Sequence, residues 1–247
     1  NLFHLLYFNI WINLLNHYFV IIKYNISLYL SEDLLNFIKL SGILGIIAVI
    51  LSLSGVFIST SLCDLGCGSD LAQYYSSRWN SDGSFSWRTN ALSDLGVSDV
   101  ANIFNYSLII SGILNFIFSI GLFRYYNKNI VLIIGSILLI IGGASLSFVG
   151  IFTEADGILH LYSAIGFFTI APLSFIIFGI YFIRIDLKNK GYFSIILGVS
   201  SLLVISAFFN SWHQYINVGF AVPEIIEAIL ISLWISWMSY DLYNYSK

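Results

Sequence analysis

Six ionisable side chains near the ends of strongly apolar segments could carry chemistry in this sequence. Five are carboxylates and one is an imidazole: Asp94, Glu154, Asp156, His160, Glu224 and Glu227. Carboxylate oxygens with one histidine nitrogen suit a hard divalent cation, and the same groups can accept or donate protons. Their spacing matches no diagnostic metal or nucleophile motif. We treat all six as candidate ligand-binding residues, and Asp94, His160 and Glu227 also as candidate catalytic residues.

Local capping offers a purely structural explanation for several of these residues. Asp94 lies in a Ser-Asp-Leu-Gly turn, where its side chain can bond nearby backbone donors. Thr153 and Asp156 have the spacing of a capping box, which also places Glu154 at the positive end of a helix. Glu224 comes directly after a proline at the expected start of the last apolar helix.

His160 and Glu227 are explained less easily by capping. His160 lies one turn beyond Asp156 and is either a hydrogen-bonded packing residue or a ligand and proton carrier. Glu227 lies one turn beyond Glu224 and is followed by an apolar stretch. An ionisable group in such a position should face the interior of a helix bundle and find a partner there.

Cys63 and Cys67 are the only cysteines, and three residues separate them. On an oxidising side of a membrane they would form a small disulfide loop, and two free thiols are the alternative. Two cysteines alone make a poor zinc site, because structural zinc takes four ligands. No metal site is assigned, and no cofactor is predicted.

The composition places the chain in a membrane. Of the 247 residues 58% are hydrophobic and 9% are charged, against roughly 25% charged residues in soluble domains. Six apolar runs have about the 20 residues that a helix needs to cross a bilayer. These runs occupy about 40–60, 104–123, 130–150, 158–183, 191–209 and 224–240. The sequence therefore predicts an all-α, polytopic membrane helix bundle with six core transmembrane helices.

Three parts are expected along the chain: an N-terminal hydrophobic helix and surface segment at 1–39, the six-helix domain at 40–243 with a long loop at 61–103, and a tail at 244–247. Within the first part, 1–22 is apolar but carries three asparagines on one helical face. This pattern is typical of either a seventh span or an amphipathic helix in the membrane interface.

The basic residues predict the orientation. If both ends of the core are cytoplasmic, only Arg78 and Arg88 of the ten lysines and arginines lie outside. Nine of the thirteen acidic residues then lie outside: Asp64, Asp70, Asp82, Asp94, Asp99, Glu154, Asp156, Glu224 and Glu227. We therefore expect a multi-pass protein of the cell membrane with cytoplasmic core termini and acidic extracytoplasmic loops.

Three stretches resemble a known family. These are Asn90 to Gly96 with the Phe-Asn pair at 104–105, Gly150 to Glu154 with His160, and Pro223-Glu224. They are similar to the prokaryotic, often archaeal, integral membrane family called domain of unknown function 998, over about residues 40–243. The resemblance implies a six-helix membrane fold and no established activity.

Two classes of function follow from these observations. The first is a non-enzymatic membrane protein, either an accessory subunit or a protein that binds a lipid or small ligand at an outward-facing polar vestibule. The alternative is a metal-assisted intramembrane enzyme that acts on lipid. Membrane lipids are the expected partners, with other membrane protein subunits as a further option. The net charge of −3 and the lack of a basic block argue against nucleic acid.

Overall fold

The computed structural model describes residues 2–64, 66–68, 70–126, 129–209 and 218–245, with side chains in these ranges from residue 32 onwards except at 70, 71 and 208. All regular secondary structure in these ranges is helical. The long helices are α1 (Leu2–Cys63), α3 (Ala101–Tyr125), α4 (Ile130–Ile151), α5 (Ile158–Arg184), α6 (Lys188–Phe209) and α8 (Ala221–Tyr243).

Six helices of the described chain are long and apolar enough to cross a membrane, and in α1 this stretch is Glu32–Cys63. The distribution of side chains agrees with a lipid environment. Large apolar residues such as Ile50, Ile196 and Leu203 are 60%, 62% and 63% exposed. Serines are buried between the helices instead, Ser41 and Ser111 among them. The chain is thus a multi-pass helical membrane protein, and the prediction of six core spans is confirmed.

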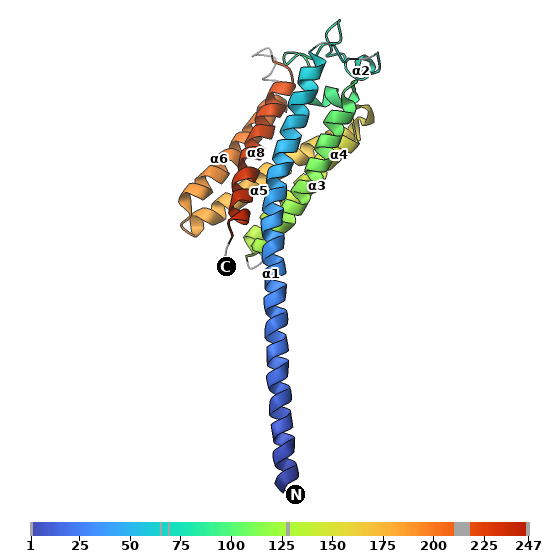
Figure 1. Ribbon diagram of the computed structural model, residues 1–247. Coiled ribbons are helices and arrows are strands. Elements are labelled where there is room, and N and C mark those ends of the chain that lie inside the picture. The colour runs from blue at the N-terminus through green and yellow to red at the C-terminus, as the bar shows by residue number, and fades with distance from the viewer. Residues whose placement is uncertain (1, 65, 69, 127–128, 210–217, 246–247) are drawn as a thin grey trace.

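The six helices form a closed bundle in which each packs against two neighbours (Figure 1). The order around the bundle is α1, α3, α4, α5, α6 and α8, and α8 returns to α1. Trp234 of α8 contacts two other helices, α5 and α6. The Phe175 ring of α5 stacks on the Trp234 ring of α8 with centroids 4.3 Å apart, and Trp234 Nε1 donates to Ser194 Oγ of α6 at 3.0 Å.

Helix α1 contains both the expected N-terminal segment and the first span. It runs without a break from Leu2 to Cys63, so the expected boundary between 1–39 and 40–243 falls inside one helix. At 1.5 Å per residue such a helix is about 93 Å long, roughly three times the thickness of the hydrocarbon core. Its N-terminal half extends beyond the bundle in Figure 1. Whether 1–22 spans the membrane stays a prediction, because the side chains of 1–31 lie outside the described part.

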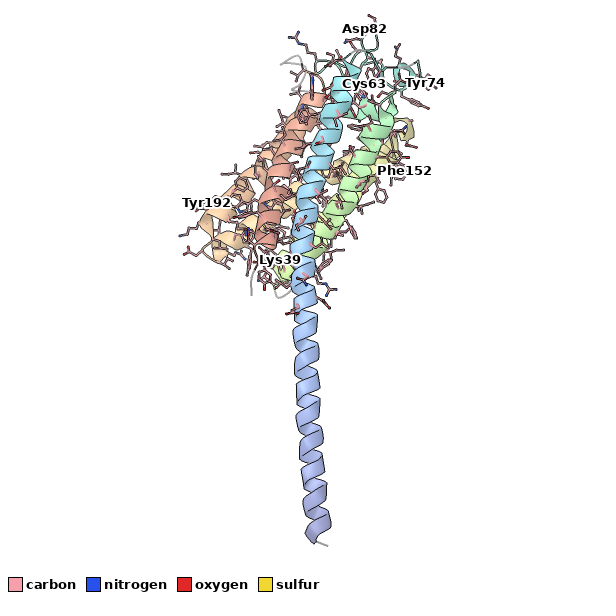
Figure 2. The ribbon with its side chains drawn as sticks, viewed as in Figure 1. Lys39, Cys63, Tyr74, Asp82, Phe152 and Tyr192 are labelled. Carbon is pink, nitrogen blue, oxygen red and sulfur yellow. A yellow bond between two sulfur atoms is a disulfide. The ribbon has the colours of Figure 1, made fainter. Side chains whose placement is uncertain are left out.

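One end of the bundle carries residues 64, 66–68, 70–100, 152–157 and 218–220, and we call it the loop end. Its short helices are α2 (Asp70–Tyr75), η1 (Leu92–Val97) and η2 (Glu154–Asp156). Cys63 and Asp82 lie at this end in Figure 2, and Lys39 lies at the opposite end of the bundle. A disulfide joins Cys63 to Cys67 with their Cα atoms 4.9 Å apart. Backbone hydrogen bonds hold both cysteines against the rest of the loop, since Cys63 O accepts from Phe85 N–H and Cys67 O from Asp99 N–H.

Candidate functional site

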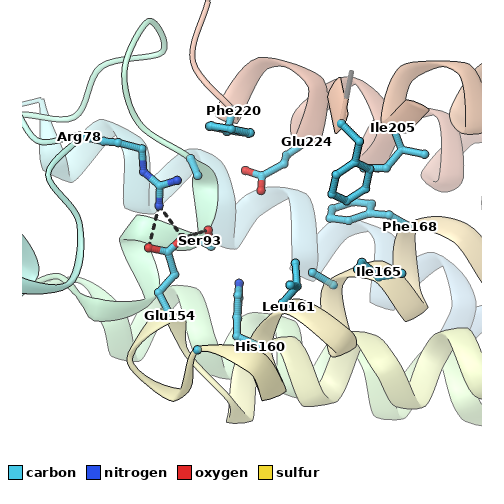
Figure 3. A pocket seen from close by; sticks show the side chains of 14 residues that line it. Arg78, Ser93, Glu154, His160, Leu161, Ile165, Phe168, Ile205, Phe220 and Glu224 are labelled. Carbon is cyan, nitrogen blue, oxygen red and sulfur yellow. Dashed lines mark hydrogen bonds and ion pairs between the residues drawn. The ribbon is translucent and has the colours of Figure 1, made fainter. Parts of the chain in front are cut away.

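A pocket of about 470 Å³ lies at the loop end, bounded by the loop, η1, α5, α6 and the start of α8. Figure 3 shows that one side of the pocket is polar and the other apolar. The lining residues are Arg78, Ala91, Ser93, Glu154, Gly157, His160, Leu161, Ala164, Ile165, Phe168, Ile205, Phe209, Phe220 and Glu224.

Arg78 organises the polar side. Its Nη2 donates to Asp94 Oδ1 at 2.5 Å and to the two carboxylate oxygens of Glu154 at 2.6 and 2.7 Å. Its Nε donates to Ser76 Oγ at 3.0 Å, which fixes the direction of the guanidinium. One arginine therefore joins η1 to η2, two segments that are far apart in the sequence.

Asp94 is fully buried behind Arg78 and does not line the pocket. Its second oxygen accepts from Asn90 Nδ2 at 2.8 Å and from the Ala91 N–H at 2.9 Å. It thus closes the first turn of η1, as the turn motif indicated, and it also anchors Arg78. The neighbouring Ser93 does line the pocket and donates through Oγ to Glu154 Oε1 at 2.7 Å.

The charged groups in this network shift the pKa values of Arg78 and Glu154. Burial works against the charge of Arg78, but Asp94 and Glu154 outweigh it, so the pKa of the guanidinium is raised. Burial raises the pKa of Glu154, and the adjacent Asp94 raises it further, while Arg78 offsets only part of this effect. Glu154 therefore takes up a proton at a higher pH than an ordinary glutamate.

Glu224 forms the opposite part of the polar side, in the first turn of α8. Its Oε2 accepts from the Leu92 N–H at 2.6 Å, and its carboxylate points into the pocket in Figure 3. Two backbone bonds position this turn, because Gly219 N–H donates to Trp87 O and Ala221 N–H donates to Asn90 O. A side chain at Gly219 would meet Asn90 O at 2.6 Å, so glycine permits this close approach.

His160 lines the pocket from the first turn of α5. Its Nδ1 lies 2.7 Å from the carbonyl oxygen of Phe152. A carbonyl can only accept, so Nδ1 must carry the hydrogen, and Nε2 of the neutral ring is then an acceptor. In Figure 3 the ring extends from α5 into the pocket, on the side of Glu224.

The apolar side of the pocket is formed mainly by α5 and α6. Leu161, Ile165 and Phe168 follow one another along one face of α5, with Ile205 opposite on α6. A second, smaller cavity of about 70 Å³ shares Ser93, His160, Ala164, Phe168 and Glu224 with the pocket. It continues between the helices to Ile231 and Ile235 of α8. Apolar space thus leads from the polar side towards the centre of the bundle.

The structure brings only part of the predicted set together. Glu154, His160 and Glu224 line the pocket, whereas Asp94, Asp156 and Glu227 do not. Asp156 forms the capping box, since its Oδ2 accepts from Thr153 N–H at 2.7 Å and from Thr153 Oγ1 at 3.3 Å. Glu227 is fully buried, and neither carboxyl oxygen has a hydrogen-bond partner in the described part of the chain.

The described side chains offer no cluster for a metal. In the chain as described, no three histidine, cysteine, aspartate or glutamate side chains are grouped so that they could hold an ion. Of the three candidate catalytic residues, His160 lines the pocket and the smaller cavity beneath it, whereas Asp94 and Glu227 line neither.

Arg78 lines the pocket but was not among the site residues predicted from the sequence. It is one of only two basic residues on the side that carries most of the carboxylates, and this imbalance was the available signal. Ser93 and the aromatic residues Phe168 and Phe220 were also not singled out, because serine and phenylalanine are common in loops and spans of this chain.

Comparison with known proteins places this architecture in a family. Residues 65–241 match the family described as "Protein of unknown function (DUF998)". The match begins later than the resemblance at about residue 40, but it includes every residue that lines the pocket. No match was found among curated proteins or among solved structures. Since the matched region covers most of the 247 residues, the chain belongs to the DUF998 family of membrane proteins.

Proposed function

We propose that this protein is a non-enzymatic membrane protein that binds an amphiphile, a lipid or lipid-like molecule, in the pocket at the loop end. The observation that carries the proposal is the division of this pocket. Arg78, Glu154, His160 and Glu224 make one side polar, and the α5–α6 wall makes the other apolar. Ligand pockets are commonly apolar with a few convergent polar groups that set orientation.

The depth of the pocket supports an occupant with an apolar tail. The lining residues of α5 extend from His160 to Phe168, which at 1.5 Å per residue is about 12 Å along the helix. The polar group would lie at the level of Glu154 and Glu224, and the tail would lie along Ile165 and Phe168. The smaller cavity beneath would admit its end between the helices.

We also propose that the loop end faces out of the cell. Arg124, Arg184 and Lys190 lie towards the ends of α3, α5 and α6 that are opposite the loop end. Cytoplasmic segments carry an excess of lysine and arginine, so this distribution favours a cytoplasmic location for that end. The pocket would then take its ligand from the outer leaflet or from the outside medium.

Blocking the apolar wall tests the proposal. Ala164 lines both the pocket and the smaller cavity, so Ala164→Trp should fill the space that a tail would occupy. We expect the wild-type protein, purified from native membrane in mild detergent, to retain about one amphiphile per chain in native mass spectrometry. Ala164→Trp should retain at most about a tenth of that amount, since a blocked pocket loses the contacts that bind the tail.

A matched control keeps this test specific. Leu173 is on the same helix but is 44% exposed on the outer surface of the bundle, so Leu173→Trp should retain as much amphiphile as the wild type. Equal retention by Ala164→Trp and Leu173→Trp would contradict the proposal. Co-purification of a stoichiometric protein with no amphiphile would also contradict it and would favour an accessory subunit.

A further inference from the structure

We propose that the pocket selects amphiphiles whose polar group is a positively charged ammonium. This inference rests on the proposed function, because it names the headgroup of the molecule that the pocket binds. It depends on three observations: the charge of the polar side, its unused hydrogen-bonding capacity, and an aromatic face that already holds a cation.

The polar side contains one cation, Arg78, and two carboxylates, Glu154 and Glu224, with the buried Asp94 behind Arg78. Arg78 is paired with Asp94 and Glu154, and these ion pairs use its Nη2 group. Glu224 has no ion-pair partner within the described residues, although its carboxylate lines the pocket. An ammonium ion beside Glu224 would form an ion pair with this carboxylate and stabilise its ionised form.

The hydrogen-bonding groups that remain in the pocket are mainly acceptors. Ser93 Oγ already donates its hydrogen to Glu154, so only its lone pairs are available. The Nε2 atom of His160 is an acceptor, because Nδ1 carries the hydrogen for Phe152 O. The Glu224 carboxylate has an oxygen that is not used by the Leu92 N–H. A primary ammonium has three N–H donors and complements such a set, whereas an anionic phosphate would face the carboxylates.

Aromatic rings in the pocket also favour a cationic headgroup. The Arg78 guanidinium lies over the Phe220 ring, 5.7 Å from its centroid, so this part of the pocket already holds a cation on an aromatic face. Phe168 lines the pocket as part of the apolar wall, and its ring is a second aromatic group in the pocket. Carboxylate and aromatic groups together are typical of sites that recognise alkylammonium ions.

A headgroup series with one common tail tests the inference. The protein in nanodiscs of uncharged lipid would be titrated with dodecylammonium, dodecanol and dodecanoate, and binding would be measured by native mass spectrometry. We expect dodecylammonium to bind at least about tenfold more tightly than dodecanol, and dodecanoate to bind most weakly. Because the tails are identical, the ratio of the dissociation constants reports the headgroup alone.

Glu224→Gln tests how much the negative charge of Glu224 contributes to the headgroup preference. The amide keeps an oxygen that can accept from the Leu92 N–H, so η1 and α8 should stay together while one negative charge is lost. The preference for dodecylammonium over dodecanol should fall to within about twofold. Asp186→Asn is the matched control, since Asp186 is exposed near the opposite end of the bundle and asparagine tolerates its positive φ of 65°.

The outcomes separate this inference from the proposed function. Equal binding of all three probes, with loss of all of them in Ala164→Trp, would overturn the ammonium preference and leave an amphiphile pocket. A preference that survives Glu224→Gln unchanged would also overturn it. Failure of every probe to bind wild-type protein would contradict the proposed function itself.

The pH dependence gives a second measurement that requires no substitution. Glu154 faces Arg78 and Asp94 from the loop, with Glu224 on α8 and His160 on α5 around the same pocket. Since burial and Asp94 raise the pKa of Glu154, lowering the pH protonates it early and removes a negative charge. Alkylammonium ions stay charged in this range, so their binding should weaken by at least about threefold from about pH 8 to about pH 5. Binding that is constant or tighter at low pH would contradict the inference.

Discussion

Arg78→Met is expected to detach the loop from the bundle and to abolish binding in the pocket. The substitution removes the cation that holds Asp94 Oδ1 and both oxygens of Glu154. Asp94 is fully buried, and breaking a buried ion pair by removal of one partner costs about 3–5 kcal/mol. The thermal unfolding temperature in detergent should fall markedly, and amphiphile retention should fall with it.

Two further variants test whether this loss of stability arises because Asp94 and Glu154 lose their cationic partner. Arg88→Met is the control, because Arg88 is exposed in the same loop and forms no ion pair within the described residues. Adding Asp94→Asn and Glu154→Gln to Arg78→Met should recover part of the lost stability, since both carboxylates then become neutral. If Arg78→Met is as stable as Arg88→Met, the Arg78 network is not what fixes the loop.

Glu227→Met is expected to stabilise the protein, which is the opposite of the usual result for a buried residue. Both carboxyl oxygens of Glu227 are buried without a partner in the described part of the bundle. A buried polar group without a hydrogen bond costs about 1–3 kcal/mol, and methionine fills a similar volume without polar atoms. The unfolding temperature of Glu227→Met should therefore rise above that of the wild type.

Glu224 provides the matched comparison one turn earlier on the same helix. Its carboxylate accepts from the Leu92 N–H, so Glu224→Met removes a hydrogen bond that joins α8 to η1. This variant should be less stable than the wild type, and the two glutamates should thus respond with opposite signs. A clear loss of stability in Glu227→Met would show that Glu227 has a partner, such as a bound ligand or a neighbouring subunit.

The parts of the fold that the sequence predicts well depend on local composition. The six spans follow from apolar runs whose length matches the bilayer, and the capping roles of Asp94 and Asp156 follow from residues three or four positions away. Helix α1 is longer than the apolar run at about 40–60 indicates, because a helix can continue through the residues before that run.

The pocket could be predicted only in part, because it depends on contacts between distant segments. Glu154, His160 and Glu224 were recognised because they are ionisable residues at helix starts. The ion pair of Arg78 with Glu154 spans 76 positions and requires the loop to fold over η2. The apolar wall could not be separated from lipid-facing residues by hydropathy, since both are equally hydrophobic. Only the packing of α5 against α6 makes that distinction.

The most direct test of the account is a density map of the protein in nanodiscs of native lipid, with a rigid antibody fragment bound for alignment. We expect elongated density in the pocket between α5, α6 and the start of α8 (Figure 3). Its polar end should lie within hydrogen-bonding distance of Glu224 and His160, and its tail along Phe168. A pocket that contains only ordered water, or that is closed by its own side chains, would contradict the claim that this protein binds an amphiphile there.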